Sequence, residues 1–320
     1  LPYETPAGLC YTSGTTGNPK GVLYSHASNL NHAMVISHVD LFGLSASDSF
    51  LQIVPMCHAN GWGLPHNVPM VGGKLVLPGP FMDGKSLFEL MTAEKCNKTC
   101  AVPTVMTFLQ DYLDSENLQI PYMSDIYIGG SAVPQSMIEE FETKYDAAVK
   151  HGWGMTELVV GTFNCNLPFM KELSFEQRMK LLSKQGRPAF GMEIKIVDDD
   201  GKSLPHDGVA FGKLMARGPR VIERYYKADK SALDSNGWFD TGDVSTIDEN
   251  GFMQITDRAK DIIKSGGEWI SSVDIENSAV RHPEVQIAAC LGVKHAKWEE
   301  RPLLIVVKKE GFNPTKKSIV

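Results

Sequence analysis

The sequence predicts an α/β protein with a large N-terminal domain of mostly parallel sheets flanked by helices, a small β-barrel-like part, and a small α+β C-terminal domain. In the first half, short apolar runs alternate with stretches of helical spacing. After about residue 186, turn sequences separate short strand patterns. From residue 258, a polar, glycine-containing loop precedes one helical pattern and two apolar runs. We therefore expect an N-terminal domain at 1–257, with a β-rich subdomain at 186–256, and an incomplete C-terminal domain at 258–320.

The alternation in the first half predicts parallel strands joined by right-handed crossovers, and hence a sheet covered on both faces. The strand candidates are Phe50–Val54, Lys74–Leu77, Cys100–Val102 and Asp125–Ile128. The helix candidates are Ser86–Cys96, Val105–Ser115, Ser136–Tyr145 and the stretch that follows Ser25. The segment Leu9-Cys10-Tyr11 also predicts a core strand.

The second half has a different pattern, with strands separated by turns. Glu193–Val197 precedes the turn sequence Asp198-Asp199-Asp200-Gly201, and Val244–Asp248 and Phe252–Thr256 flank Glu249-Asn250-Gly251. These strands predict antiparallel pairing in a small barrel. The final stretch predicts a helix at Val273–Arg281 and strands at Val285–Val293 and Leu303–Lys308.

Composition and charge limit the classes of function. With 42% hydrophobic and 22% charged residues, the chain is typical of a globular protein, and its 320 residues fit about two domains. The net charge of −7, from 31 basic and 38 acidic residues, argues against a general nucleic-acid or membrane-surface binder. It leaves room for a local site for a small anion. No apolar run of about 18 residues predicts a transmembrane segment.

The ends of the sequence predict a fragment. Leu1–Pro6 lacks the basic and apolar stretches of a signal peptide, and the chain does not begin with Met. A strand pattern starts almost at once, so we expect the natural N-terminus to lie upstream. We expect a cytoplasmic protein, with organelle targeting left open because both ends are expected to be missing.

The six cysteines are scattered without the spacing of a disulfide framework or a zinc site. Cys96 and Cys100 are four residues apart, but no second pair of ligands accompanies them. Buried thiols in a reducing compartment are the simpler interpretation.

The segment Tyr11–Gly21, which reads Tyr-Thr-Ser-Gly-Thr-Thr-Gly-Asn-Pro-Lys-Gly, predicts a phosphate-binding loop. Glycines let backbone amides approach a polyanion, and Ser and Thr hydroxyls add donors. Lys20 can neutralise the charge of a β- or γ-phosphate through charge-assisted bonds. The loop is not a Walker loop, because Lys20 follows Pro19 rather than a glycine.

This string closely resembles the signature of the adenylate-forming superfamily, which contains acyl-CoA synthetases, luciferases and amino-acid adenylation domains. The resemblance implies that a carboxylic acid is first joined to AMP, and that its acyl group is then transferred to coenzyme A. The implied cofactors are ATP, Mg²⁺ and coenzyme A, and the partners are these small molecules and a carboxylic acid, without nucleic acid. A homodimer is one assembly that this resemblance allows.

A second segment, His151-Gly152-Trp153-Gly154-Met155-Thr156-Glu157, resembles another core motif of the superfamily. The resemblance implies that Trp153 stacks near adenine, Thr156 bonds the α-phosphate and Glu157 holds Mg²⁺. The segment Ile128–Pro134 resembles the loop whose backbone borders adenine and the acyl group. A single carboxylate is compatible with Mg²⁺, which typically takes only one or two protein carboxylates when it binds phosphate.

Two later segments extend the resemblance over the whole chain. Trp238–Asp243 and Asp257–Trp269 match segments in which Asp243 and Arg258 contact ribose and Lys260 is the hinge of the C-terminal domain. The resemblance assigns catalysis to Lys20, Thr156, Glu157 and Lys260. It assigns nucleotide binding to Thr12, Ser13, Gly14, Thr15, Thr16, Gly17, Lys20, Gly130, Ser131, Ala132, Trp153, Gly154, Met155, Thr156, Asp243 and Arg258. It assigns coenzyme A binding to Ser265, Gly266, Gly267, Glu268 and Trp269.

The acyl pocket is expected at Pro55–Gly63, together with residues after two of the strands. Its predicted members are His58, Trp62, Val102, Pro103, Gly129 and Gly154. His58 and Trp62 are four residues apart and would share a face on a helical turn. No Asp or Glu occurs from Phe50 to Met82, which disfavours a substrate ammonium group. Acetate-type synthetases carry a bulky Trp at the position of Gly154, so Gly154 would leave room for a longer acid.

The closest resemblance is to medium- and long-chain fatty acyl-CoA synthetases and to ligases acting on 3-methylmercaptopropionate. A luciferase-like oxygenase and a non-catalytic nucleotide-binding homologue are the alternatives. The superfamily also supplies a lysine from a Pro-x-x-x-x-Gly-Lys stretch, and no such string follows Lys308. We therefore expect this piece alone to bind nucleotide poorly and to adenylate little.

Overall fold

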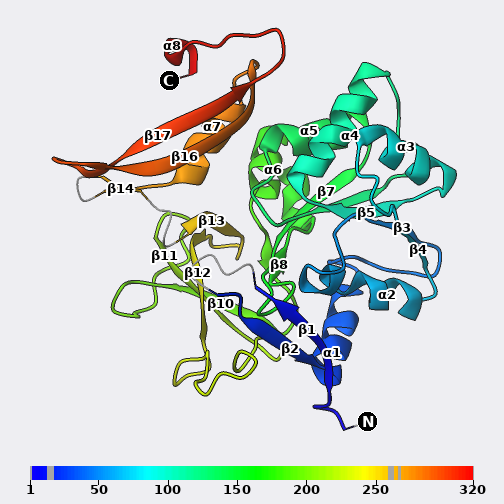
Figure 1. The fold of residues 1–320 in the computed structure, drawn as a ribbon, viewed down its shortest axis with the longest axis vertical. Helices are drawn as coiled ribbons and strands as arrows, with labels where there is room; N and C mark the ends of the chain where they lie inside the picture. Colours follow the sequence, from blue (N-terminus) through cyan, green and yellow to red (C-terminus); the bar gives the residue numbers. More distant parts are fainter. Residues whose placement is uncertain (1, 13–17, 259–262, 266–267, 320) are drawn as a thin grey trace. The chain divides into compact units, whose positions relative to one another are not determined.

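The computed structural model describes residues 2–12, 18–258, 263–265 and 268–319. The chain divides into two compact units, of which the first contains Leu1–Ile194 and Ala216–Phe239 and the second contains Lys195–Met215 and Asp240–Val320. Figure 1 shows the elements of each unit. The predicted boundary between 257 and 258 stays a prediction.

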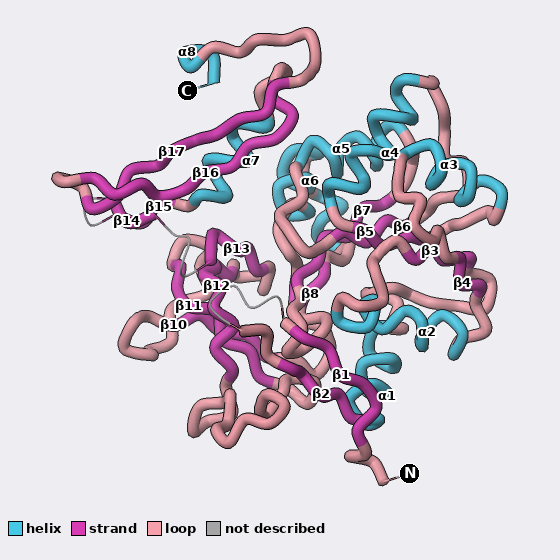
Figure 2. The backbone as a smooth tube through the Cα atoms, viewed as in Figure 1, coloured by secondary structure: helices cyan, strands magenta, loops and turns pink. Residues whose placement is uncertain are grey.

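The first unit is built on a seven-stranded sheet with the order β4-β3-β5-β6-β7-β8-β9 (Figure 2). The strands from β4 to β7 are parallel neighbours, whereas β8 and β9 are added antiparallel. Their bounds are β3 Ser49–Gln52, β4 Lys74–Val76, β5 Lys98–Ala101, β6 Asp125–Ile128, β7 Ala148–Trp153, β8 Thr162–Phe163 and β9 Arg187–Pro188. The predicted mostly parallel sheet is confirmed.

Helices cover the sheet, with α3, α4 and α5 along one face and α2 along the other in Figures 1 and 2. Their bounds are α1 His26–Ile36, η1 Ala59–Gly63, α2 Leu64–Met70, α3 Gly84–Ala93, α4 Pro103–Ser115, α5 Gln135–Lys144, η2 Pro168–Glu172 and α6 Phe175–Leu182. Ser25 caps α1, because its hydroxyl accepts a hydrogen bond from the Ser28 amide at 3.1 Å. All four predicted helices are present, whereas α2 and α6 were not predicted.

The prediction of a core strand at Leu9-Cys10-Tyr11 is wrong in one respect. β1, at Pro6–Tyr11, pairs only with β2, at Gly21–Ser25, in a separate two-stranded sheet. Cys10 is buried, but Leu9 and Tyr11 are 40% and 58% exposed. Alternation of buried and exposed residues is typical of a strand with one covered face, and three residues are too few to show it in the sequence.

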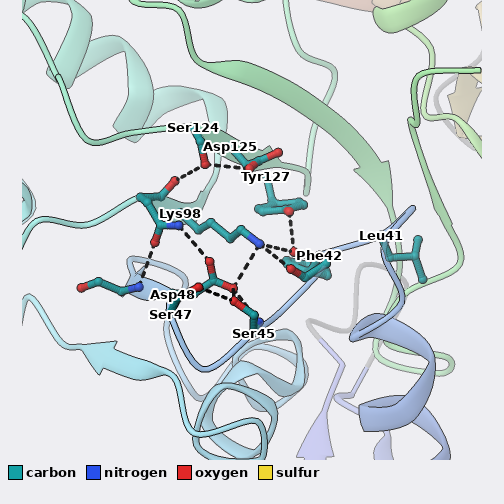
Figure 3. A network of polar contacts seen from close by, with 12 residues as sticks. Leu41, Phe42, Ser45, Ser47, Asp48, Lys98, Ser124, Asp125 and Tyr127 are labelled. Carbon is teal, nitrogen blue, oxygen red and sulfur yellow. Dashed lines mark hydrogen bonds and ion pairs between the residues drawn. The ribbon is translucent and has the colours of Figure 1, made fainter.

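The amino ends of the parallel strands are joined by a buried ion pair (Figure 3). Lys98 begins β5, and its ammonium donates to Asp48 at 3.2 Å and to the carbonyls of Phe42 and Gly43 at 2.9 and 2.6 Å. Asn97 donates to the other carboxylate oxygen of Asp48 at 2.8 Å. Burial opposes ionisation of Asp48, but the bonds from Asn97 and Ser45 and the charge of Lys98 outweigh it and lower the pKa of Asp48.

The same region anchors an aromatic core that continues toward the opposite end of the sheet. The rings of Phe42 and Tyr127 stack with centroids 4.1 Å apart, and the Tyr127 hydroxyl donates to the Phe42 carbonyl at 2.8 Å. Phe163 packs edge-on against Phe42 at 5.2 Å and against Trp62 at 6.5 Å. The core therefore runs from the buried ion pair to Trp62.

The second unit contains two four-stranded sheets, with orders β10-β11-β12-β13 and β15-β14-β17-β16. Their bounds are β10 Glu193–Val197, β11 Phe211–Arg217, β12 Phe239–Ile247, β13 Met253–Arg258, β14 Ile263–Ser265, β15 Glu268–Ile270, β16 Val285–His295 and β17 Glu299–Lys308. The helices are α7 Ser272–Val280 and α8 Lys316–Ile319. Within the described residues, β10 and β13 are the outer strands of the first sheet, so the expected barrel-like part is an open sheet here.

Replacing Lys98 with Met should destabilise the fold, because it leaves the buried Asp48 carboxylate without its cation. We expect a loss of roughly 3–5 kcal/mol in the free energy of unfolding, measured by urea denaturation. The double variant Lys98→Met, Asp48→Asn should recover part of that loss. A single variant that loses less than about 1 kcal/mol would show that the pair is not needed.

Candidate active site

An apolar pocket lies where the parallel strands end, which is where ligands bind in open α/β sheets. β6 ends at Ile128 and leads into Gly129 and Gly130, and β7 ends at Trp153. The pocket has a volume of about 180 Å³. Its lining consists of His58, Ala59, Trp62, Gly129, Gly130, Gly152, Trp153, Gly154, Met155, Thr156, Val159, Val160 and Phe163. The structure thus brings two separately predicted motifs and the predicted acyl segment to one cavity.

One wall of the pocket is a left-handed turn, η1. All five of its residues have positive φ, including Ala59 at 38°, Asn60 at 49° and Trp62 at 58°. Such a turn costs roughly 1–2 kcal/mol for each residue other than glycine. His58 and Trp62 both line the pocket as predicted, although the turn that follows His58 is left-handed rather than an ordinary helical turn.

Buried polar contacts hold this turn. The Cys10 thiol donates to the Asn60 side chain at 2.8 Å, and the Gln52 amide donates to the Gly61 carbonyl at 3.3 Å. His32 Nε2 lies 3.0 Å from the Trp62 carbonyl. Because a carbonyl can only accept, we assign the proton of His32 to Nε2. Cys10 and His32 were not predicted as site residues. Each lies far in sequence from the residue it contacts, Cys10 by 50 positions from Asn60 and His32 by 30 positions from Trp62.

Gly154 is required by a close backbone approach. A Cβ atom built there would lie 1.9 Å from the Val159 carbonyl oxygen. Val159 has φ of +63°, which is strained for a β-branched residue, and its amide donates to the Met155 carbonyl at 2.7 Å. A side chain at 154 would meet this carbonyl rather than fill the cavity. The expectation that Gly154 lengthens the pocket by lacking a side chain therefore receives no support from this geometry.

Trp153 and Glu157 are both buried, with exposed fractions of 7% and 6%. The Trp153 ring packs over Gly161, where an added Cβ would lie 2.3 Å from the ring. The Tyr24 hydroxyl donates to the Thr156 carbonyl at 2.5 Å. Burial raises the pKa of Tyr24, so this hydroxyl keeps its proton.

Glu157 is held by a segment distant in sequence. Its backbone carbonyl accepts from the Ile222 amide at 3.0 Å, and its Oε1 accepts from the Tyr225 hydroxyl at 2.7 Å. A hydrogen bond to a charged group contributes roughly 1.5–3 kcal/mol. No basic side chain pairs with Glu157 within the part of the chain that the structure describes.

The two ends of the predicted phosphate loop are tied together. The Thr12 amide donates to the Lys20 carbonyl at 2.9 Å, and the Lys20 amide donates to the Thr12 hydroxyl at 3.2 Å. The Lys20 ammonium lies 4.7 Å from the centroid of the Tyr225 ring. Ser13, Gly14, Thr15, Thr16 and Gly17 lie outside the described residues. Lys20 and Glu157 therefore contact the same tyrosine, which the sequence did not single out as a nucleotide-site residue.

Other predicted residues lie elsewhere. The described residues that line the pocket do not include Val102, Pro103, Ser131 or Ala132. Val102 precedes α4, and its Cγ1 lies 3.3 Å from the position of a Cβ built on Gly130. Val102 and Pro103 were predicted as pocket residues, whereas η1 and the residues after β6 and β7 form the wall within the described residues.

In the second unit, Asp243 and Arg258 are opposite each other on β12 and β13. Asp243 is 7% exposed, and only the backbone of Arg258 is described. Ser265 is buried and pairs with Glu268 in the β14–β15 hairpin. Lys260, Gly266 and Gly267 lie outside the described residues, as do the side chains of Glu268 and Trp269. The predicted ribose residues thus share one strand pair.

The donor set around Glu157 fits a magnesium ion bound together with phosphate. Among the described residues, no group of three or more His, Cys, Asp or Glu side chains could hold a metal ion. Mg²⁺ in phosphate sites typically takes one or two carboxylates and completes its shell with water and phosphate oxygens. Within the described residues, the buried Glu157 carboxylate accepts a hydrogen bond from the Tyr225 hydroxyl and forms no ion pair, which matches that requirement.

Two buried histidines should make the fold sensitive to acid. Burial lowers the pKa of His32 and of His151 to about 4. The unfolded chain takes up these protons near pH 6.5, so stability present above about pH 6.5 is lost as the pH falls toward 4. We expect a loss on the order of 2 kcal/mol per histidine between pH 7.5 and pH 5, measured by urea denaturation.

The variants His32→Gln and His151→Gln should each show a shallower dependence of stability on pH. His206 is exposed, so His206→Gln is the matched control and should leave the dependence unchanged. Equal dependence of stability on pH in the unmodified protein and all three variants would contradict a role for the two buried histidines.

None of the described helices has the length and apolar character needed to cross a membrane.

Residues 1–226 match the family model described as AMP-binding enzyme, and residues 274–320 match the AMP-binding enzyme C-terminal domain. A medium-chain-fatty-acid–CoA ligase from Ectopseudomonas oleovorans is 51% identical over 303 residues, which cover 94% of this chain and 56% of the ligase. A 3-methylmercaptopropionyl-CoA ligase from Ruegeria lacuscaerulensis is 47% identical, with 99% of this chain and 59% of the ligase covered. The chain thus spans somewhat more than half the length of these relatives.

A comparison with solved structures also finds a coenzyme A synthetase. The o-succinylbenzoate coenzyme A synthetase from Bacillus subtilis, in complex with ATP and magnesium ion, superposes with a TM-score of 0.82 at 28% identity. The superposition covers 98% of this chain and 62% of that synthetase. The family model, the close relatives and the shared fold agree, and the chain belongs to the family of AMP-binding enzymes.

Proposed function

We propose that this protein is an ATP-dependent carboxylic acid–CoA ligase that forms an acyl-AMP intermediate and then a thioester with coenzyme A. The observation that carries the proposal is one cavity at which an apolar wall meets the Trp153–Thr156 motif, which the buried Glu157 follows directly in the chain. An apolar pocket beside a phosphate and metal site suits a carboxylic acid whose carboxylate meets ATP and whose tail avoids water.

The first half-reaction is assigned to the first unit. An oxygen of the substrate carboxylate attacks the α-phosphorus of ATP, a new bond to phosphorus forms, and pyrophosphate leaves. Lys20 neutralises phosphate charge, Thr156 bonds the α-phosphate and Glu157 holds the metal. When bound, Mg²⁺ neutralises phosphate oxygens and orients them for this displacement. Positioning and charge neutralisation dominate such a reaction, because no side chain needs to act as a nucleophile.

The second half-reaction involves the segments after β12. The thiol of coenzyme A attacks the acyl carbon, and AMP leaves with the oxygen that came from the acid. Asp243 and Arg258, which face each other on β12 and β13, are proposed to hold the ribose. We assign Lys260 to a hinge between domains at 1–257 and 258–320, and Ser265–Trp269 to the coenzyme A channel. We also propose a cytoplasmic location and a homodimer as the assembly to test.

The proposed substrate is a medium- or long-chain fatty acid or 3-methylmercaptopropionate. Support comes from the relatives named for these activities and from the character of the pocket wall. Trp62, Val160 and Phe163 supply apolar surface, and no acidic residue lines the cavity among the described residues. An amino-acid substrate would bring an ammonium group that this wall leaves unpaired.

Replacing Glu157 with Gln should strongly impair metal-dependent adenylation. Glutamine keeps an acceptor for the Tyr225 hydroxyl but removes the charge that binds Mg²⁺. We expect kcat/KM for ATP–pyrophosphate exchange to fall by roughly 100-fold in the full-length protein. Glu116, an exposed residue at the end of α4, provides the control Glu116→Gln. An unchanged rate of ATP–pyrophosphate exchange in Glu157→Gln would contradict the assignment of Glu157 as the Mg²⁺ ligand.

A panel of acids from acetate to hexadecanoate, together with 3-methylmercaptopropionate, should identify the substrate. The measurement is coenzyme A-dependent release of AMP by the full-length protein. We expect acetate to be a poor substrate and apolar acids of intermediate length to be good ones. Preference for acetate or for an amino acid would contradict the pocket assignment. Light emission or oxygen consumption with an acid would favour a luciferase-like oxygenase instead.

A further inference from the structure

The segment from Ile222 to Tyr226 joins two motifs that are more than 130 residues apart in the sequence. At one end, the Ile222 amide donates to the Glu157 carbonyl at 3.0 Å. At the other end, the Tyr226 amide donates to the carbonyl of Gly21 at 2.7 Å, and Gly21 directly follows Lys20. Two backbone hydrogen bonds therefore fix this segment between the end of the phosphate loop and the metal-site turn.

The side chain between these two bonds contacts the charged group of each motif. The Tyr225 hydroxyl donates to Glu157 Oε1 at 2.7 Å, and the Lys20 ammonium lies 4.7 Å from the centroid of the Tyr225 ring. The Tyr225 hydroxyl is the donor in this bond, because a carboxylate oxygen accepts. One rigid ring thus touches a cation with its face and an anion with its hydroxyl.

We propose that Tyr225 is a positioning residue that holds the Lys20 ammonium and the Glu157 carboxylate apart at a fixed spacing for magnesium-bound ATP. The inference rests on the proposed function. A direct Lys20–Glu157 ion pair would neutralise the two charges that the site needs for phosphate and metal. Tyr225 engages both groups without cancelling either charge, and its hydroxyl orients the carboxylate as an outer-shell partner orients a metal ligand.

A packing role is the alternative to this positioning role. Tyr225 also packs against a small core formed by Cys10, Val22, Tyr24, Ile222 and Phe239. Loss of that packing would destabilise the fold without a selective effect on the metal. The two roles are separable because Tyr225→Phe keeps the ring and removes only the hydroxyl, whereas Tyr225→Leu removes both contacts.

The test measures binding of Mn²⁺, as a probe for Mg²⁺, to the full-length protein with a non-hydrolysable ATP analogue. Free Mn²⁺ is followed by electron paramagnetic resonance. We expect Tyr225→Phe to raise the Kd for Mn²⁺ roughly tenfold, as is usual for loss of an outer-shell partner. Tyr225→Leu should in addition weaken binding of the analogue at saturating metal, because Lys20 also loses its support. Tyr226→Phe is the matched control, since the Tyr226 side chain is 42% exposed and only its backbone is used.

A double-mutant cycle separates positioning from general damage. In the Glu157→Gln background, Tyr225→Phe should change Mn²⁺ binding no further, because the carboxylate through which Tyr225 acts is gone. If Tyr225→Phe weakened Mn²⁺ binding equally in both backgrounds, or had no effect in the otherwise unmodified protein, the inference would be overturned. The proposed function would still stand, provided that the unmodified protein formed acyl-AMP. If the unmodified full-length protein neither bound the nucleotide nor formed acyl-AMP, the proposed function would be overturned together with the inference.

Discussion

The site depends on how the chain turns after β7. Gly154 lets the backbone pass so close to Val159 that a Cβ atom there would lie 1.9 Å from the Val159 carbonyl oxygen. This approach places Trp153 at the end of a sheet strand and Glu157 one short turn later, both buried. Tyr24 and Tyr225 then fix the turn from two different segments. If the turn relaxed, the pocket wall and the carboxylate would move together.

The two ends of the parallel strands differ in structure. At the amino ends, the Lys98–Asp48 pair joins β5 to the chain before β3, and the stacked rings of Phe42 and Tyr127 extend inward from it. At the carboxyl ends, the strands give way to glycines and to the turn at Gly154. The core reaches the pocket wall at Trp62 through Phe163, so the packing at the amino ends continues to the cavity.

Strain is concentrated in the pocket wall. The five residues of η1 and Val159 all have positive φ, and each of these residues other than Gly61 and Gly63 typically costs about 1–3 kcal/mol. Hydrogen bonds from Cys10, Gln52 and His32 hold the left-handed turn. A wall that is fixed by such contacts keeps the shape of its cavity, which favours selection of a ligand by shape rather than by charge.

The sequence predicted features that depend on neighbouring residues, and it did not predict contacts between residues far apart in the chain. The alternation of apolar runs and helical spacing predicted β3 to β6 and four helices. The Trp153–Glu157 motif predicted residues that the structure places together after β7, and its metal site stays a prediction. Nothing local marks Tyr225 as a contact of Glu157, because the two residues are 68 positions apart. The left-handed turn was missed because Ala59 and Trp62 carry no preference for positive φ, although Asn60, Gly61 and Gly63 tolerate it. Gly154 was predicted to lengthen the pocket, and the structure adds a close backbone contact with the Val159 carbonyl that the sequence does not indicate.

The origin of the oxygen atoms in AMP shows whether an acyl-AMP intermediate forms. The full-length protein would be given ATP, coenzyme A and octanoic acid that carries ¹⁸O at both carboxyl oxygens, and the AMP would be analysed by mass spectrometry. Attack of the carboxylate on the α-phosphorus, followed by thioester formation, predicts AMP with one ¹⁸O atom. Unlabelled AMP, or label in inorganic phosphate with ADP as the nucleotide product, would contradict an acyl-AMP intermediate.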